Sequence, residues 1–385
     1  MASCTPPFAI TDAILTSSTA PEPGVGEVAW TSGATFAERD RAILGAPSAT
    51  VTISIASPGV VAWTDNGLPD GTPVVLTTTG ELPTGLTAGQ IYYVVSRAAD
   101  SFRLSAVPGG APIVTTGSQS GTHTATASIH TVYESVADSN AGNPPAIDDG
   151  TKWIKVGPTN RHAMLDLYRS SKTWAPSPLT IVITPGQRID SLFLGGLVAD
   201  SVSVVMTVDG GEVYNSTRSL FARQTLSWRD YYFRPIERRA SALLQDLPPY
   251  TGATVTVTIT RAAGLVGCAS LVIGQSIYLG TAIMGAEADA ENFSKISQNE
   301  FGETELVPRR SVPLAEMTIR FESQRSRALM DLRERVSALP CVWSGLDDDT
   351  HPYFEPVLIL GTYARFRLNL DQPDDALLYL TAREI

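Results

Sequence analysis

Residues Thr254–Thr260 read TVTVTIT, and residues 202–208 read VSVVMTV. Along both stretches apolar side chains recur at every second position, which is the period of a β-strand with one buried and one wet face. Between residues 173 and 286 further strand patterns recur at spacings of about 8 to 12 residues, as in two-sheet folds. No helical pattern alternates with them. We therefore predict a central β-sandwich of jelly-roll type over residues 161–312.

The stretch 262–286 carries no charged residue and is long enough to cross a bilayer. Five glycines interrupt it, Gln275 lies in its middle, and the strand pattern of Thr254–Thr260 precedes it. Glycine inside an apolar run is typical of bends between buried strands. We predict two buried strands here and no membrane span.

The last part of the chain, residues 313–385, has a different pattern. Leu329, Leu332, Val336 and Leu339 recur at helical spacing between Ser323, a candidate N-cap, and Pro340, a candidate stop. Strand patterns flank this run on both sides. A helix over residues 324–339, packed on an antiparallel sheet, makes this segment a small α+β domain.

Residues 50–127 stand out because they hold only six charged side chains among short strand patterns and turn signals. This composition predicts a small β-domain of its own. The segments on either side are each too short to bury a core, so we expect residues 1–49 and 128–160 to complete each other as one split β-module. The fold class predicted for the whole chain is mainly β and multi-domain.

Composition excludes several function classes. The 385 residues are 43% hydrophobic and 17% charged, which disfavours intrinsic disorder, and the net charge of −11 would repel a phosphate backbone. Cys4, Cys268 and Cys341 are far apart and odd in number, so free thiols are expected. The first twenty residues contain no Lys or Arg and no continuous apolar core. We therefore expect synthesis in the cytoplasm without a secretory signal, and no nucleic-acid partner.

Motifs that carry chemistry are scarce. The sequence has no HExxH, GxSxG, P-loop, GxGxxG or EF-hand pattern, so we predict no enzyme, no catalytic residue and no cofactor. Four histidines (His123, His130, His162 and His351) are scattered without metal spacing. Residues 347–349 with His351 could hold Ca²⁺, but a solvated loop is the preferred interpretation, and no metal is predicted.

The run 228–239 reads WRDYYFRPIERR and mixes aromatic rings with arginines, as grooves for single-stranded nucleic acid do. In an acidic chain we interpret it instead as a sandwich strand, with the stretch 231–233 in the strand and arginines on the wet face. The arginines at positions 325, 327, 333 and 335 are interleaved with Asp331 and Glu334, as on an ordinary solvated helix face.

An aromatic set marks the split module, namely Trp30, Phe36, Tyr133 and Trp153. Sugar-binding modules expose such rings because the apolar faces of sugars stack on them, whereas in a tiny β-fold the same rings form the core. Core is the preferred interpretation. The four residues are nevertheless the candidate glycan-binding residues of this sequence.

Two segments of the split module resemble the small chitin-binding-type module of carbohydrate-binding family 5/12. They are Ala29-Trp30 with residues 35–40 (TFAERD), and residues 132–135 (VYES) with 140–145 (NAGNPP) and Trp153. The family pattern has a glycine where this chain has Arg39.

The continuation resembles minor tail proteins of tailed bacteriophages. It comprises residues 153–161 (WIKVGPTNR) with 164–166 (MLD), residues 246–250 (DLPPY) and the glycine-rich stretch 273–280. The inserted unit, with residues 82–89 (LPTGLTAG) and 92–95 (YYVV), is similar to a β-module that recurs in phage tail and fibre proteins.

The resemblance implies a non-enzymatic virion protein of the tail tip or baseplate, present in several copies. Its implied partners are other tail or baseplate proteins and glycans of the host surface. The alternative is a glycan-binding or glycan-degrading surface protein in which a sugar-binding module delivers a hydrolase. Glycosidase chemistry needs two carboxylates facing one cleft, and the sequence offers no convincing pair.

Overall fold

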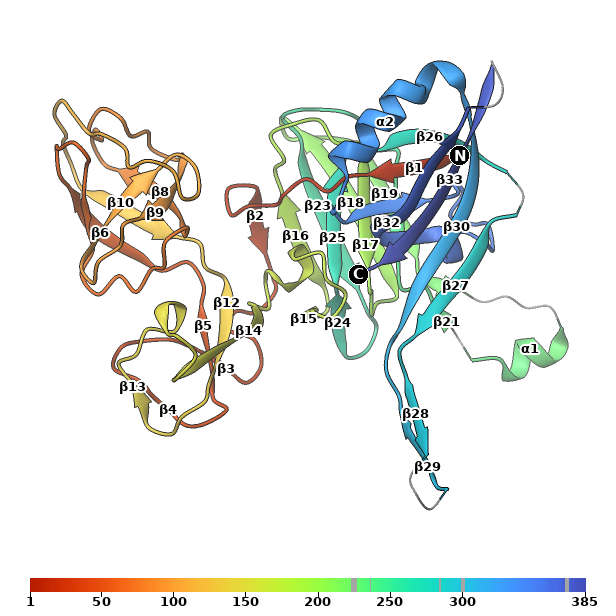
Figure 1. Ribbon diagram of the computed structural model, residues 1–385, viewed down its shortest axis with the longest axis horizontal. Helices are drawn as coiled ribbons and strands as arrows, with labels where there is room; N and C mark the ends of the chain where they lie inside the picture. The colour runs from red at the N-terminus through yellow and green to blue at the C-terminus, as the bar shows by residue number, and fades with distance from the viewer. Residues whose placement is uncertain (223–226, 236, 284, 299–301, 371–373) are drawn as a thin grey trace. The chain divides into compact units, whose positions relative to one another are not determined.

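The structure is a computed structural model that describes residues 1–385 except 223–226, 236, 284, 299–301 and 371–373 (Figure 1). It is mainly β, which confirms the predicted fold class. The chain forms two compact units. Unit 1 comprises Met1–Ala20 and Ala163–Ile385, and unit 2 comprises Pro21–His162.

A β-sandwich makes up the first part of unit 1. Its larger sheet has the order β19-β18-β23-β16-β2, and its smaller sheet has the order β22-β17-β25. The strands are β2 (Leu15–Ser18), β16 (Leu179–Ile183), β17 (Ser191–Gly195), β18 (Ser201–Val208), β19 (Gly211–Ser219), β22 (Ala242–Leu244), β23 (Thr254–Thr260) and β25 (Ser270–Gly274). The predicted β-sandwich is present, but its bounds differ from 161–312: β2 joins it from the N-terminal residues, and the strands after β25 belong to other sheets.

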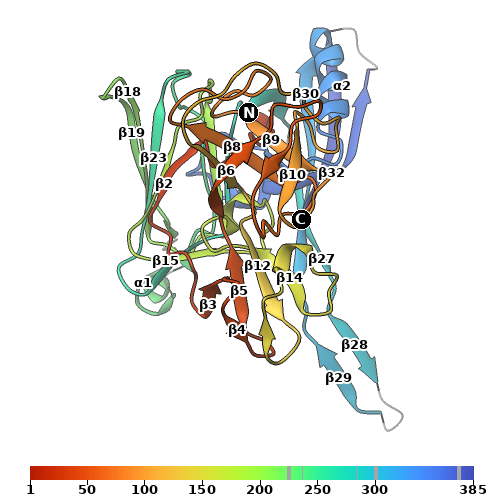
Figure 2. The same ribbon diagram turned by 90° about the vertical axis from the view of Figure 1, so that its left-hand side faces the viewer.

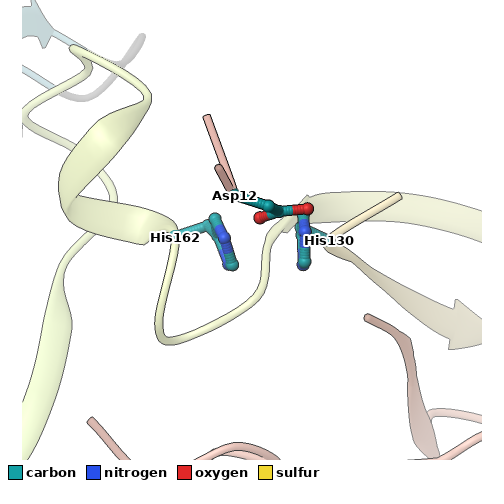
Figure 3. Close-up of side chains that lie close together, drawn as sticks. All are labelled: Asp12, His130 and His162. Atoms are coloured by element: carbon teal, nitrogen blue, oxygen red, sulfur yellow. The ribbon is translucent and has the colours of Figure 1, made fainter. Parts of the chain in front are cut away.

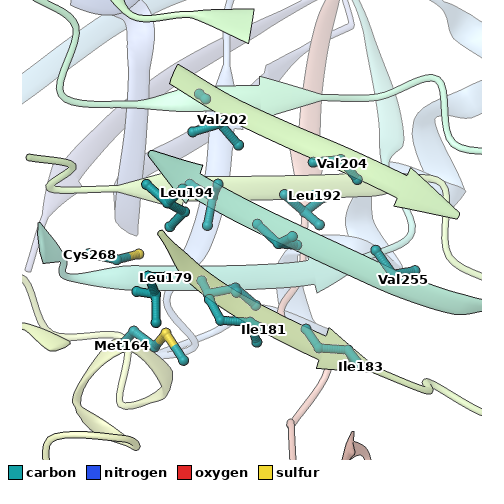
Figure 4. Close-up of a cluster of buried hydrophobic side chains, with 14 of the residues drawn as sticks. Met164, Leu179, Ile181, Ile183, Leu192, Leu194, Val202, Val204, Val255 and Cys268 are labelled. Carbon is teal, nitrogen blue, oxygen red and sulfur yellow. The ribbon is translucent and has the colours of Figure 1, made fainter. Parts of the chain in front are cut away.

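The alternation in the sequence is what builds this core. Along β23 the valines and the isoleucine are buried while the threonines between them are partly exposed, and Val257 pairs across to Val204 of β18. Figure 4 shows side chains of both sheets meeting between them, among them Leu192 and Leu194 of β17. Smaller elements complete this part: η2 (Ala163–Leu165), and the pair β15 (Thr173–Pro176) with β24 (Leu265–Cys268).

A second sheet of unit 1 has the order β26-β1-β31-β32-β33-β30-β27. Because β26 also pairs with β30, the first six of these strands form a closed ring. The strands are β1 (Ala2–Thr5), β26 (Ile277–Ala282), β27 (Glu287–Asn292), β30 (Ser311–Glu322), β31 (Cys341–Ser344), β32 (Leu358–Asn369) and β33 (Asp375–Glu384). Inside lies a separate apolar core that includes the fully buried Trp343.

Helix α2 (Ser326–Arg335) contributes to this core through Leu329 and Leu332, and Val336 just beyond the helix is also buried. The helix is shorter than the predicted stretch 324–339. The predicted N-cap Ser323 instead begins a 3₁₀ turn, η3 (Ser323–Arg325), and the helix ends before Ala338, whose φ of 58° is left-handed. The spacing of the apolar residues located the buried face of the helix correctly, although the helix begins later and ends earlier than predicted.

The N-terminal residues differ from the predicted domain division. The split module was expected to begin at residue 1, but Met1–Ala20 belong to unit 1. The reason is strand pairing, because β1 lies between β26 and β31, with Cys4 opposite Trp343. An apolar cluster that includes Phe193, Val272 and Leu358 also joins the sandwich to this second sheet.

At the position of the predicted inserted β-domain, residues 50–127, unit 2 contains a closed six-stranded barrel. Its strands are β6 (Ser48–Ile53), β7 (Val61–Ala62), β8 (Pro73–Thr78), β9 (Ile91–Val95), β10 (Ser101–Ser105) and β11 (His123–Ala127). Closure leaves no free sheet edge within the barrel. The two ends of the insertion meet, since the Ala127 amide donates to the Pro47 carbonyl at 2.9 Å.

The rest of unit 2 is the small module built from the two flanking segments. One sheet has the order β14-β12-β5-β3, and a second, two-stranded sheet pairs β13 with β4. The elements are β3 (Glu27–Ala29), β4 (Thr35–Phe36), β5 (Arg41–Leu44), β12 (Thr131–Ser135), β13 (Asn140–Ala141), η1 (Pro145–Ile147) and β14 (Trp153–Pro158). Arg39 adopts a φ of 72°, a left-handed conformation that favours glycine.

The uncharged stretch 262–286 forms three strands, β24, β25 and β26, where two buried strands were predicted, and the third is only partly buried. Residue 284 lies outside the described residues. Neither of the two α-helices in the described part of the chain has the length and apolar character needed to cross a bilayer. All three cysteines are free and buried, as expected.

One predicted strand is wrong. The stretch 231–233 lies in a short helix, α1 (Trp228–Phe233), and not in a sandwich strand. Residue 236 of this run lies outside the described residues. The correction matters for function, because it places a group of aromatic rings outside the core.

Candidate interaction surfaces

Helix α1 lies away from the sheets of unit 1 (Figure 1), and we call α1 together with the strand pair β20 (Phe221–Ala222) and β21 (Glu237–Arg238) the finger. This two-stranded pair is the base of the finger. The helix begins where the Ser227 hydroxyl accepts a hydrogen bond from the Asp230 amide at 3.1 Å. It ends before Pro235, which cannot continue a helix.

No residue of α1 is buried. Trp228 and Phe233 expose 79% and 80% of their surface, and Tyr231 and Tyr232 are also exposed. The rings contact one another: Tyr231 and Tyr232 meet edge to face at 5.1 Å, and Trp228 lies 6.2 Å from Tyr231. A contiguous exposed aromatic patch is typical of an interaction site, and Trp, Tyr and Arg dominate the energetic centres of protein interfaces.

The base of the finger is firmly held. Arg238 donates to the Asp200 carboxylate at 2.6 Å, and the other oxygen of Asp200 accepts from the Ala262 amide at 2.7 Å. The amide of Ala262 and the guanidinium of Arg238 together hold the pKa of Asp200 below its ordinary value. Arg239 donates to the carbonyl of Asp349 at 2.7 Å. These hydrogen bonds fasten the base of the finger to the body of unit 1.

A second projection, which we call the arm, is the hairpin of β28 (Lys295–Gln298) and β29 (Thr304–Val307). It extends the ribbon of β27 and β30 away from the sheet in Figures 1 and 2. Ile296 and Leu306 pair directly across the hairpin and are 73% and 67% exposed. An isolated two-stranded hairpin is only marginally stable in water, so a cover over this apolar pair would stabilise the arm.

Strand β27 is the outermost strand of the second sheet and pairs only with β30 among the described residues. All six of its residues are exposed, and Glu287, Asp289 and Glu291 alternate along it. Glu291 forms an ion pair with Arg383 at 2.6 Å. We call residues Glu287–Asn292 the acidic edge.

A groove of about 510 Å³ lies between the sandwich and the second sheet within unit 1. Two glutamates line it. Glu384 is engaged at both carboxylate oxygens, by Arg169 and by Arg310, the latter at 2.6 Å. Glu355, in η4 (Glu355–Val357), is half-buried, and burial raises the pKa of its carboxyl against the opposing effects of Arg239 and the Ala240 amide.

The four predicted glycan-binding residues lie together in the split module, but as its core. Phe36, Tyr133 and Trp153 are buried, and the partly buried Trp30 packs against them. Phe36 and Trp153 meet edge to face at 5.0 Å, and the Trp153 indole donates to the carbonyl of Asn143 at 2.9 Å. A buried ring offers no free face to a sugar, so this arrangement favours the interpretation of the set as core.

Sequence spacing did not anticipate a pair of histidines in unit 2. His130 and His162 stack with ring centroids 3.6 Å apart and nearly parallel planes (Figure 3). Asp12, drawn beside them, belongs to unit 1 and is not part of this pair. The two histidines are 32 positions apart, and only the return of the chain beside β12 brings them together. His123 is satisfied separately, by Thr78 and Gln119 in the barrel.

The acidic run 347–349 is committed to several different partners. Asp347 accepts from the N-terminal amine at 2.9 Å, and Asp348 accepts from the amide and hydroxyl of Thr350. Asp349 pairs with Arg218 at 3.4 Å. These donors lower the pKa values of Asp347 and Asp348. Because the three carboxylates bind different partners, they fit a hydrogen-bonded loop better than a set of ligands that surround one cation.

Comparisons with known proteins identify no relative of this chain. No family model, no curated protein and no solved structure matches the chain significantly. The geometry of the projections and the resemblances in the sequence are therefore what bears on function.

Proposed function

We propose that the chain is a structural virion protein of a tailed bacteriophage, located at the tail tip or baseplate, where it joins other tail proteins. The observation that carries this proposal is the finger, whose helix exposes four aromatic side chains. The arm, with its exposed pair Ile296 and Leu306, adds a second apolar projection. Surfaces of this kind are stabilised when another protein covers them.

The sequence resemblance supplies the setting of this assembly role. The motif of residues 153–161 and 164–166 resembles the phage minor tail proteins, and the sequence of the inserted unit at residues 82–89 and 92–95 resembles a β-module of tail and fibre proteins. In this setting the protein is made in the host cytoplasm and resides in the tail in several copies. Contact with host glycans would then require a surface other than the buried rings of the split module.

Localisation in the particle tests the proposal. Particles produced from the genome that encodes the chain would be purified, and the chain located by cryo-electron microscopy with labelled antibody as a second readout. The expected result is density for the sandwich and barrel at the distal end of the tail. Absence of the chain from purified particles, with the protein present in the lysate, would overturn the proposal.

A glycan-degrading role is favoured by one observation only, the raised pKa of Glu355 in the groove. A carboxyl with a raised pKa is what a general acid needs. The second glutamate of the groove, Glu384, is held by two guanidinium groups and cannot readily act as the partner base or nucleophile. A zymogram on cell-wall and capsule polysaccharides decides this point, with Glu355→Gln as the control that must abolish any clearing.

A further inference from the structure

Two of the three cysteines lie side by side in the core of the second sheet. Cys4 is in β1, Cys341 is the first residue of β31, and both side chains are fully buried. The two strands pair antiparallel, with Cys4 opposite Trp343. Because side chains alternate along a strand, Cys341 points to the same face as Trp343, and all three residues belong to the apolar core inside the ring. Cys341 is therefore the diagonal neighbour of Cys4 across the two strands.

The thiols of this pair are in contact. A side-chain hydrogen bond joins Cys4 and Cys341, and the Cys341 thiol also donates to the carbonyl of Leu339 at 3.5 Å. From such a contact the two sulfur atoms must approach by less than about 2 Å to reach the length of a disulfide bond. Cys341 begins its strand and Cys4 is next to the end of β1, so a shift at either position disturbs few backbone hydrogen bonds of the sheet.

The third cysteine is placed differently. Cys268 is also buried, but it lies in the core of the sandwich, where its thiol donates to the carbonyl of Ser270 at 3.6 Å. Cys4 and Cys341 belong to the other core. The fold therefore offers one pair of thiols that can be joined and one buried thiol as a matched control.

Burial holds back the reactivity of the pair while the fold is closed. It raises the pKa of the Cys4 thiol well above its ordinary value, and the neighbouring Cys341 raises this pKa further, against a smaller opposing effect of Arg335. The thiolate is the form that attacks a disulfide, and the folded protein offers little of it. Oxidation therefore takes place as the chain folds or when β1 opens, and a bond once formed is protected by the same burial.

We propose that Cys4 and Cys341 are a covalent modification site, at which the two thiols close to a disulfide that fixes β1 in the second sheet. The oxidant is a small disulfide such as oxidised glutathione. The thiolate of one cysteine attacks it, a mixed disulfide forms and one glutathione thiolate leaves. The second cysteine thiolate then attacks the mixed disulfide and releases the other glutathione. Two protein thiols are oxidised, one disulfide is reduced to two glutathione thiols, and these take up the two protons.

The bond would act on the closure of the ring. Strand β1 lies between β26 and β31 and so completes the closed ring of strands. A disulfide here prevents β1 from separating from β31. Because most of the chain lies between the two cysteines, it also closes a very long loop in the unfolded state, where a cross-link restricts the chain most. In a reducing compartment the pair stays as two thiols, and in an oxidising one it closes, whichever proteins the chain assembles with.

Refolding of the full-length chain in glutathione buffers tests this inference. The reduced chain is unfolded in urea and diluted into native buffers of set glutathione ratio, so that access to buried thiols does not limit the reaction. After acid quenching, mass spectrometry of non-reduced peptides should show the peptides of Cys4 and Cys341 joined with the loss of two hydrogen atoms, and Cys268 free. The equilibrium constant for closure should be on the order of a hundredfold larger in native buffer than in urea. By linkage the disulfide raises the folding equilibrium constant by the same factor.

Substitution of each cysteine separates the pair from the control. Cys268→Ala should form the disulfide like the wild type, whereas Cys4→Ala and Cys341→Ala should keep both remaining thiols free. Circular dichroism checks that each variant is folded, and the peptide maps of the wild type and of Cys268→Ala decide the question even if the other two variants do not fold. Three free thiols in the folded wild type in the most oxidising buffer, a bond that includes Cys268, or a closure constant no larger in native buffer than in urea would overturn the inference.

Discussion

The split module and the finger use the same residue types for opposite purposes. In the split module, Trp153 is 2% exposed and meets Phe36 edge to face, whereas in the finger Trp228 is 79% exposed and contacts only other exposed rings that the structure describes, those of Tyr231 and Tyr232. The module surrounds its rings with paired strands, while α1 has no strand over it. Aromatic content therefore does not identify a ligand surface. Whether the rings are buried or exposed depends on the strands or helix that carry them.

The strongest test of this comparison is Trp153→Ala. Truncating a buried aromatic residue costs about 3 to 5 kcal/mol, and here the hydrogen bond from the indole to Asn143 is lost as well. We expect the split module to unfold or to lose its cooperative transition in urea. Trp228→Ala is the matched control, because the same substitution in the finger should leave unfolding unchanged. If both substitutions changed the free energy of unfolding equally, the difference between the buried Trp153 and the exposed Trp228 would be contradicted.

The two helices offer the same contrast. Helix α2 buries Leu329 and Leu332, whereas α1 buries nothing. We expect Leu332→Ala to destabilise unit 1 by about 2 to 5 kcal/mol, because the cavity would open in a well-packed core. Equilibrium unfolding in urea measures this. A neutral result would mean that the face of α2 is not core; Arg327→Ala on the exposed face is the control.

Local sequence patterns predicted a large part of this fold. Period-two alternation located the sandwich strands, and the spacing of Leu329, Leu332 and Val336 located the buried face of α2. These features depend on neighbours a few residues away. The pairing of β1 with β31 joins residues 3 and 344, and no local pattern contains that information.

The site was less predictable, for a related reason. Tyr and Phe favour strands, which is why the run 231–233 predicts one. The structure instead has a short helix there, which Ser227 caps at its start and which ends before Pro235. That capping pattern was the available signal for the finger. The stacked pair of His130 and His162 depends on tertiary folding and left no such signal.

Acid should loosen the loop that leads to the buried Trp153. One oxygen of Asp148 accepts hydrogen bonds from the amides of Gly150, Lys152 and Trp153, at 2.9, 3.0 and 3.0 Å. Burial tends to raise the pKa of Asp148, but these amide donors outweigh it and the pKa lies below its ordinary value. A lowered pKa in the folded state stabilises the fold above the ordinary Asp value of about 3.9. That contribution is lost as pH falls through the folded-state pKa.

Hydrogen exchange at residues 148–158, corrected for the intrinsic effect of pH, measures this contribution. Asp148→Asn should cost about 1 kcal/mol of protection at neutral pH and should remove the acid dependence. Asp149→Asn is the control, because Asp149 bonds only the Thr151 amide in this loop. Protection that is independent of pH in the wild type would show that the carboxylate does not hold the loop.

The smallest effect on stability is expected where the aromatic residues are most exposed. Replacing Trp228 and Phe233 together by serine removes large apolar surface that touches no core, so the free energy of unfolding should change by less than about 0.5 kcal/mol. Retention on a hydrophobic-interaction column should nevertheless fall clearly, since retention reports exposed apolar area. Replacing Phe36 by serine, the control in the split module, should have the opposite profile, with a large loss of stability. If the finger substitutions were to cost more than about 1 kcal/mol, the rings would be packed in solution, and the finger would be a structural element of unit 1 and not a docking surface.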